Sequence, residues 1–149
     1  MPYTFLCSLG SNIRPEYHVS RAKSYLTGVG SKISYSRVIT TEPVAMPSDQ
    51  LFLNALFVIE THLDASKLKQ AYNAIEISLG RDRSDPLCKI KDRPIDLDIL
   101  GEIPAAAERD AEVALAQWPA TPDYLTVLRN ELFSQYYALP APQQESVNS

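Results

Sequence analysis

The chain has 149 residues, of which 45% are hydrophobic, so it is long enough for one domain with a single core. Its net charge of -4 argues against a general affinity for nucleic acid or an anionic membrane, because the overall field repels phosphate groups. The longest apolar run, 51–60, contains Asn54 and is too short and too polar to span a bilayer.

The two cysteines point to a reducing compartment. Cys7 lies in an apolar run and Cys88 in a polar one, and they form neither a disulfide framework nor a metal-ligand spacing. The N-terminal stretch has no basic leader and is typical of a first strand. We therefore expect a cytoplasmic protein, and the sequence does not indicate its oligomeric state.

The first elements alternate in type. Residues 3–8 are rich in apolar and aromatic types and predict a strand that ends at a turn formed by Gly10, Ser11 and Asn12. Pro15 is well placed to open a helix, whose apolar residues recur at helical spacing until Gly28. β-Branched residues alternate with polar ones over 31–41 and predict a second strand, ended by Glu42 and Pro43.

The same alternation follows in the next segment. Residues 51–61 predict a strand that is apolar on both faces. A helix capped by Asp64 or Ser66 should then run to Gly80. A polar, charged segment over 81–93 leads to a last strand over 94–100.

This order, β-α-β-β-α-β, predicts an α+β fold, a ferredoxin-like sandwich with helices on one face of an antiparallel sheet. We expect a single domain over 1–149, with its core in 1–101. A helical C-terminal segment over 102–140 should contain two helices, near 105–117 and 122–138. The Pro-, Gln- and Ser-rich end at 141–149 is typical of a frayed tail.

Two carboxylates interrupt the last strand. Residues two apart share a face, so Asp96 and Asp98 should point together while Ile95, Leu97 and Ile99 point into the core. Their Cβ atoms would lie about 6 to 7 Å apart, which suits a shared hard cation such as Mg²⁺. The alternative is that these acids are the polar side of a solvated sheet face.

The segment before this strand is locally basic. It has five cations against three acids: Arg81, Arg83, Lys89, Lys91 and Arg93 against Asp82, Asp85 and Asp92. Basic side chains bind phosphate oxygens while a metal bridges phosphate and carboxylate, so this loop beside two aspartates is typical of a metal-nucleotide site. A solvated connection is the alternative for the loop taken alone.

With these motifs in view, the sequence resembles the 6-hydroxymethyl-7,8-dihydropterin pyrophosphokinase family of folate biosynthesis. The resemblance rests on SLGSN at 8–12, TTEPVAMPSDQLFLNALFVIET at 40–61, IEISLGRDR at 75–83 and RPIDLDIL at 93–100. These segments stand in the family's order and near its spacing. The resemblance implies a ferredoxin-like core, ATP as co-substrate, a pterin as small-molecule partner, and two Mg²⁺ ions.

The resemblance also implies roles for individual residues. Asp96 and Asp98 would bind the two Mg²⁺ ions, and Arg93 would be a catalytic residue that binds phosphate. Arg81 and Arg83 would open a mobile catalytic loop, the first as a catalytic residue and the second toward ATP. The residues expected near the two substrates are Glu76 for the adenosine and Thr41, Val44, Phe52 and Asn54 for the pterin.

After Gly101 the resemblance stops. Trp118, Tyr124 and Phe133 are available aromatic residues, but their context does not identify which one would close the pterin site. Two hypotheses therefore stay open. The chain is an active Mg-ATP-dependent pyrophosphokinase, or it is a paralogue with weak or no catalysis that binds pterin or nucleotide as a regulatory module. The paired aspartates with Arg93 favour the first, and the divergent C-terminal segment favours the second.

Overall fold

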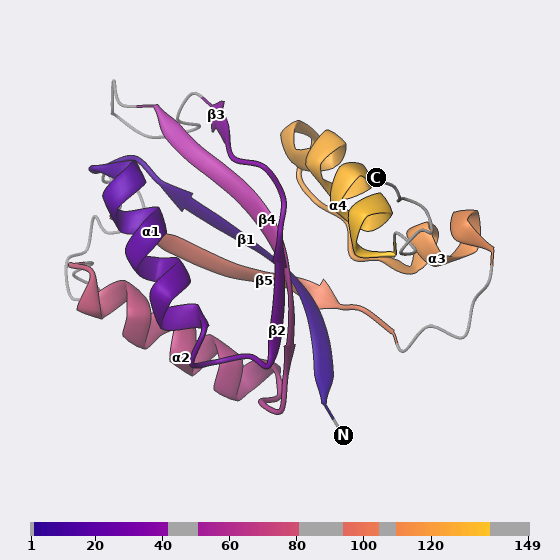
Figure 1. Cartoon of the computed structure of the whole chain (residues 1–149), viewed down its shortest axis with the longest axis horizontal. Coiled ribbons are helices and arrows are strands. Elements are labelled where there is room, and N and C mark those ends of the chain that lie inside the picture. Colours follow the sequence, from indigo (N-terminus) through magenta and orange to yellow (C-terminus); the bar gives the residue numbers. More distant parts are fainter. Residues whose placement is uncertain (1, 42–50, 81–93, 105–109, 138–149) are drawn as a thin grey trace, which may run out of the picture.

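The computed structural model describes residues 2–41, 51–80, 94–104 and 110–137 (Figure 1). Its strands and helices follow in the order expected from the sequence, with further helices after the last strand. They are β1 (Tyr3–Ser11), α1 (Pro15–Leu26), β2 (Lys32–Tyr35), β3 (Ile39–Thr41), β4 (Phe52–Thr61), α2 (Ala65–Ser78), β5 (Asp96–Glu102), α3 (Ala111–Gln117), a 3-10 turn η1 (Asp123–Leu125) and α4 (Thr126–Tyr136).

The described strands form one antiparallel sheet in the order β2-β4-β1-β5, with the short β3 also paired to β4. The central pair is β1 with β4, which places Gly10 opposite Asn54. On its other side β1 pairs with β5, which places Gly10 opposite Asp96 and Ser8 opposite Asp98. This strand order, with two helices after the first and third main strands, confirms the α+β ferredoxin-like fold.

One face of the sheet packs against α1 and α2. Alternate residues of β1, β4 and β5 point toward these helices, because successive side chains of a strand lie on opposite faces. The core they form is continuous along the sheet, and its buried members are Phe5, Cys7, Leu9, Val19, Ala22, Leu26, Ala55, Phe57, Ile59, Leu68, Tyr72, Ile75, Ile95 and Leu97.

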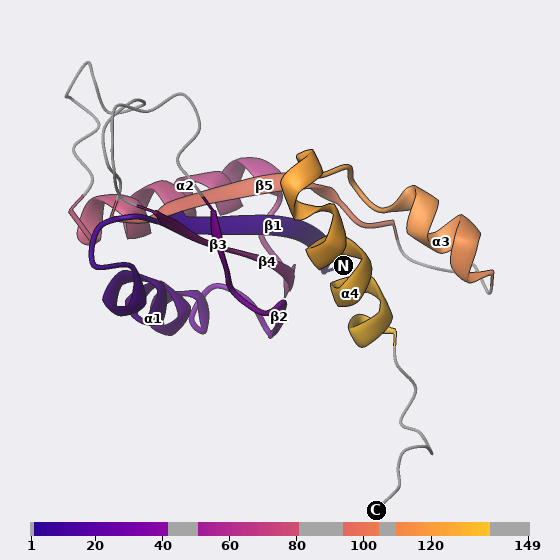
Figure 2. The same cartoon turned by 90° about the horizontal axis from the view of Figure 1, so that it is seen from above.

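The opposite face carries the C-terminal helices (Figures 1 and 2). Leu6, Leu56 and Val58 come from the sheet and are buried beneath α4 and the segment before it. Their partners in this second core are Ile103, Ala114, Trp118, Leu125, Leu128, Leu132 and Phe133. The strand β4 is therefore apolar on both faces, as its sequence predicts, because helices cover both sides of it.

Several predicted boundaries are wrong. The first strand does not end at a turn after residue 8, because β1 continues through Gly10 and Ser11 and keeps its pairing with β4. The predicted strand over 31–41 is two strands, broken at residues 36–38. The last strand begins at Asp96 and reaches Glu102, and the helix predicted near 122–138 starts with a 3-10 turn and ends at Tyr136.

Other local predictions are confirmed. Pro15 occupies the first turn of α1. Asp64 caps α2, since its side chain accepts a hydrogen bond from the Lys67 backbone N–H at 2.9 Å. None of the helices in the described part of the chain combines the length and the apolar character that crossing a bilayer requires.

Candidate active site

Among the residues that the structure describes, the apolar core under α4 covers only part of the sheet face that carries this helix, and we call the rest the open half. It lies at the end of the sheet where β1 finishes and β4 and β5 begin. Asn54, Gly10 and Asp96 form one row across three adjacent strands, and Leu56, Ser8 and Asp98 form the next. Residues in register share a face, so the predicted metal ligands and the predicted pterin ligands meet on one surface.

The two aspartates have the orientation that the sequence predicts. Ile95 and Leu97 are buried in the core under α1 and α2, so Asp96 and Asp98 point to the other face, where both are partly exposed. Asp98 forms an ion pair with Lys69 of α2, with 3.7 Å between Oδ1 and Nζ. Both side chains of this pair are about half exposed, at 50% and 44%, and such exposed pairs contribute little to stability.

Glu76 lies beneath the strand that carries the aspartates. Its side chain is fully buried in α2, and its Oε2 accepts a hydrogen bond from the Leu97 backbone N–H at 2.8 Å. This N–H comes from the residue between Asp96 and Asp98. The carboxylate of Glu76 therefore fixes the backbone of β5 where the two metal-ligand candidates emerge, while its predicted role toward adenosine stays a prediction.

The predicted pterin ligands form a contiguous polar and aromatic group. The Asn54 side-chain amide donates a hydrogen bond to the Thr41 hydroxyl, which joins β4 to β3. Phe52 lies two residues before Asn54, on the same face of β4, and is 9% exposed. Gly10 gives this group its room, since a Cβ there would lie 2.9 Å from Asn54 Oδ1 and 3.7 Å from the Phe52 ring.

The sequence does not indicate which of Trp118, Tyr124 and Phe133 would close the pterin site, and the structure distinguishes Tyr124 from the other two. Tyr124 is 51% exposed on η1, whereas Trp118 and Phe133 are buried in the second core at 3% and 8%. Partial burial, followed by the charges of Asp96 and Asp98, raises the pKa of the Tyr124 hydroxyl. Tyr124 is therefore the exposed member of the three candidate aromatics, and its hydroxyl lies within the field of the aspartate pair.

The remaining predicted site residues, Val44, Arg81, Arg83 and Arg93, lie outside the described residues. The binding roles predicted for them stay predictions.

The two aspartates are better suited to Mg²⁺ than to a metal that protein side chains enclose completely. Mg²⁺ is usually bound by one or two carboxylates and completes its shell with water and substrate phosphate oxygens. Asp96 and Asp98 supply that donor set on a partly exposed surface. Within the described ranges no group of three or more His, Cys, Asp or Glu side chains could hold a metal by itself. This part of the chain therefore fits a metal that a substrate helps to bind.

Comparison with known proteins bears on what this surface recognises. The family model for 7,8-dihydro-6-hydroxymethylpterin-pyrophosphokinase matches residues 6–140, which is most of the chain and includes α3 and α4. The chain belongs to this pyrophosphokinase family. The match extends past Gly101, where the resemblance by motif stops, so the helices on the second face lie within the family's domain.

Two relatives are similar over a shorter region. Both are named 2-amino-4-hydroxy-6-hydroxymethyldihydropteridine pyrophosphokinase and come from two strains of Porphyromonas gingivalis. Each is 36% identical to this chain over 95 residues, which is 62% of this chain and 65% of the relative. The alignment therefore spans somewhat less than two thirds of the relatives' length.

Proposed function

We propose that this protein transfers a diphosphate group from ATP to the hydroxymethyl group of 6-hydroxymethyl-7,8-dihydropterin, giving AMP and the pterin diphosphate. The observation that carries the proposal is the shared face of Asp96, Asp98, Asn54 and Thr41. A polyphosphate-binding acid pair and a heterocycle-binding amide lie in adjacent rows of one sheet surface. The names of the two relatives and the family match support the same substrates.

On the pterin side, the residues offer one flat wall and a set of polar groups. Asn54 can both donate and accept hydrogen bonds, as the edge of an aminopteridine requires, and the Thr41 hydroxyl fixes its orientation. The Phe52 ring lies beside Gly10, where a side chain would occupy the space above Asn54. Tyr124 is our candidate for the opposing aromatic surface, since it is 51% exposed and the charges of Asp96 and Asp98 act on its hydroxyl.

On the nucleotide side, Asp96 and Asp98 would hold Mg²⁺, which supplies positive charge against the polyphosphate chain. Arg81, Arg83 and Arg93 carry the complementary positive charge, and the resemblance assigns them phosphate-binding and catalytic roles. Phosphoryl transfer of this kind depends on positioning and charge stabilisation more than on a strong base. The buried Glu76 contributes by fixing the Leu97 backbone between the two aspartates.

The ion pair of Asp98 with Lys69 does not argue against this function. Both side chains are about half exposed, so the pair is screened by water and a divalent cation can replace the ammonium group.

The direct test is to mix the purified protein with Mg-ATP and 6-hydroxymethyl-7,8-dihydropterin and to measure AMP. We expect AMP and pterin diphosphate in equal amounts, and none without Mg²⁺. ADP as the nucleotide product would exclude diphosphate transfer. Binding of both substrates without AMP would favour the regulatory-module alternative. The cytoplasmic location expected from the cysteines stays a prediction.

A further inference from the structure

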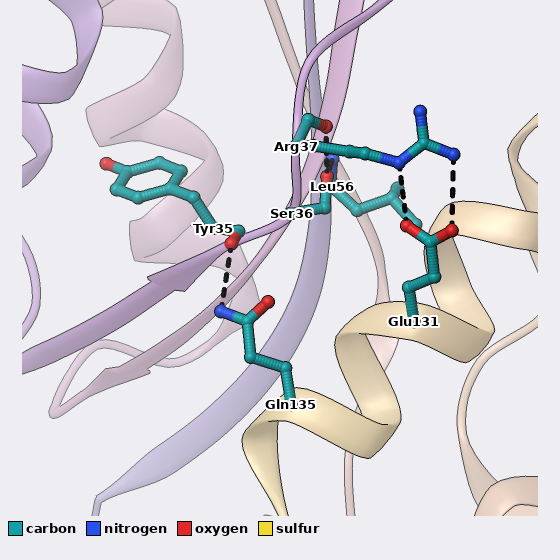
Figure 3. A network of polar contacts seen from close by, with 6 residues as sticks. All are labelled: Tyr35, Ser36, Arg37, Leu56, Glu131 and Gln135. Atoms are coloured by element: carbon teal, nitrogen blue, oxygen red, sulfur yellow. Dashed lines mark hydrogen bonds and ion pairs between the residues drawn. The ribbon is translucent and has the colours of Figure 1, made fainter. Parts of the chain in front are cut away.

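The helix α4 is joined to the segment between β2 and β3 by polar contacts (Figure 3). Arg37 Nε donates to Glu131 Oε1 at 2.8 Å, and Arg37 Nη2 donates to Glu131 Oε2 at 3.2 Å. Gln135, one turn further along α4, donates from its side-chain amide to the Tyr35 carbonyl at 3.3 Å. The paired hydrogen bonds of an arginine and a carboxylate fix the relative orientation of the two groups as well as their distance.

Arg37 stands at the point where the second strand is interrupted. Its neighbour Ser36 keeps the break attached to β4: the Ser36 backbone N–H donates to the Leu56 carbonyl at 2.8 Å, and the Leu56 N–H donates to Ser36 Oγ at 2.9 Å (Figure 3). Ile39, two residues after Arg37, packs against the core beneath α4. The helix therefore contacts the chain at Tyr35 and Arg37, directly before β3, and Ile39 of β3 packs against the core to which α4 contributes.

The strand β3 makes few stabilising contacts of its own. It is three residues long and pairs with β4 through the positions of Ile39, Thr40 and Thr41. Short edge strands contribute few hydrogen bonds and depend on packing for their order. Yet β3 carries Thr41, whose hydroxyl accepts the hydrogen bond of the Asn54 amide. The position of β3 therefore determines how Asn54 is presented in the open half.

We propose that the Arg37–Glu131 ion pair is a positioning contact, through which α4 holds β3 in register so that Thr41 orients Asn54 for the heterocyclic substrate. Neither residue touches the substrate, because both act through β3. The identity of that substrate rests on the proposed function above. The hydrogen bond from Arg37, with its charge, lowers the pKa of the Glu131 carboxyl, so the pair is ionised at neutral pH.

The ion pair is separable from the attachment of α4 itself. Leu128 and Leu132 are almost fully buried, and Tyr136 donates a hydrogen bond to Glu60 of β4. These contacts hold α4 on the sheet without Arg37. Because Arg37 and Glu131 are both exposed, their loss should change the global stability very little. A change in pterin binding without a change in stability therefore distinguishes positioning from a merely structural role.

The test compares Arg37→Glu, Glu131→Arg and the double variant that exchanges the two charges. Arg21→Glu is the matched control, since Arg21 is an exposed arginine of α1 that contacts the Tyr25 ring. The dissociation constant of 6-hydroxymethylpterin is measured with Mg²⁺ and a saturating non-hydrolysable ATP analogue. We expect each single variant to weaken pterin binding about threefold to tenfold, and the double variant to restore it within about twofold.

Two further measurements make the result specific. The affinity for the Mg²⁺-bound ATP analogue alone should be unchanged in all variants, because Asp96 and Asp98 lie on β5. Amide hydrogen exchange over residues 36–41 should be faster in both single variants, restored in the double variant and unaffected in the control. Unchanged exchange and pterin affinity in the single variants, or no restoration in the double variant, would overturn the inference.

A failure of the proposed function gives a different pattern. If the wild-type protein binds no pterin, the assignment of the substrate is wrong, and the exchange rates alone decide whether the ion pair holds β3.

Discussion

The two halves of the sheet face beneath α4 use the same strands for opposite purposes. In the covered half, Leu6, Leu56 and Val58 are almost completely buried and bind the C-terminal helices. In the open half of the same face, Gly10 is in register with Asn54 and Asp96, and Ser8 is in register with Asp98. The apolar core under α4 reaches Leu56, which is in register with Ser8 and marks the border between the two halves. Stability and binding are separated along the strands.

Replacement of the aspartates should have the largest effect. Asp96→Asn and Asp98→Asn each remove a negative charge from the open half and should lower turnover about a thousandfold or more, as loss of transition-state charge stabilisation does. Stability should be unchanged or slightly higher, because repulsion between the two acids is relieved. AMP formation and thermal unfolding are the measurements. Glu112→Gln on α3 makes the same chemical change away from the site and should leave both unaltered.

In the covered half, Leu132→Ala should act on stability. Leu132 is fully buried, so its truncation leaves a cavity and should cost about 2 to 5 kcal/mol in the free energy of unfolding. Denaturant titration measures this cost. Val127→Ala removes methyl groups from a side chain of the same helix that is 60% exposed, and it should cost less than about 0.5 kcal/mol. Equal costs would mean that α4 does not bind the sheet through its apolar face.

The row of Asn54, Gly10 and Asp96 connects the two proposed substrate sites, and a substitution at Gly10 tests its role in binding. A Cβ at this position lies 2.9 Å from Asn54 Oδ1, so Gly10→Ala should displace the amide and weaken pterin binding about tenfold. Binding of the Mg²⁺-nucleotide should be nearly unchanged. The matched control is Gly28→Ala, where the nearest atom to the added Cβ is 3.6 Å away. Normal pterin affinity in Gly10→Ala would place the heterocycle elsewhere.

The smallest effect should come from Lys69. Its exposed ion pair with Asp98 competes with a cation for the carboxylate, so Lys69→Gln should lower the Mg²⁺ concentration needed for nucleotide binding by about twofold. Lys67→Gln, on the same helix, is the control for the change in net charge. A large loss of nucleotide affinity in Lys69→Gln would instead show that this lysine binds phosphate.

The sequence predicts much of the separation between residues that stabilise the core and residues that bind substrates. The alternation of Ile95, Asp96, Leu97 and Asp98 fixes which side chains share a face, and the structure confirms it. The apolar residues on both faces of 51–61 predict a strand buried on both sides, but the predicted fold has helices on one face of the sheet, and only the structure places α3 and α4 on the other. The helical ends at Pro15 and Asp64 follow from rules that depend only on neighbours in the chain.

The errors arise where distant residues decide. Gly10 and Ser11 have the composition of a turn, but pairing with Asn54 and Leu53 keeps them in the strand. The break at Ser36 depends on its hydroxyl, which binds the backbone of Leu56 twenty residues away in the chain. The alternation of apolar and polar residues in the sequence does not reveal such a contact. Tyr124 gave no local signal, because the charges of Asp96 and Asp98 reach η1 only through the folding of the chain after β5.

The most direct measurement is a calorimetric titration of the wild-type protein, Asp96→Asn and Asp98→Asn with a non-hydrolysable ATP analogue, with and without Mg²⁺. The open half predicts that the wild-type protein binds the analogue tightly only when Mg²⁺ is present, and that both variants lose this dependence. Equal, Mg²⁺-dependent affinity in all three proteins would contradict the assignment of the aspartates to a magnesium-nucleotide site.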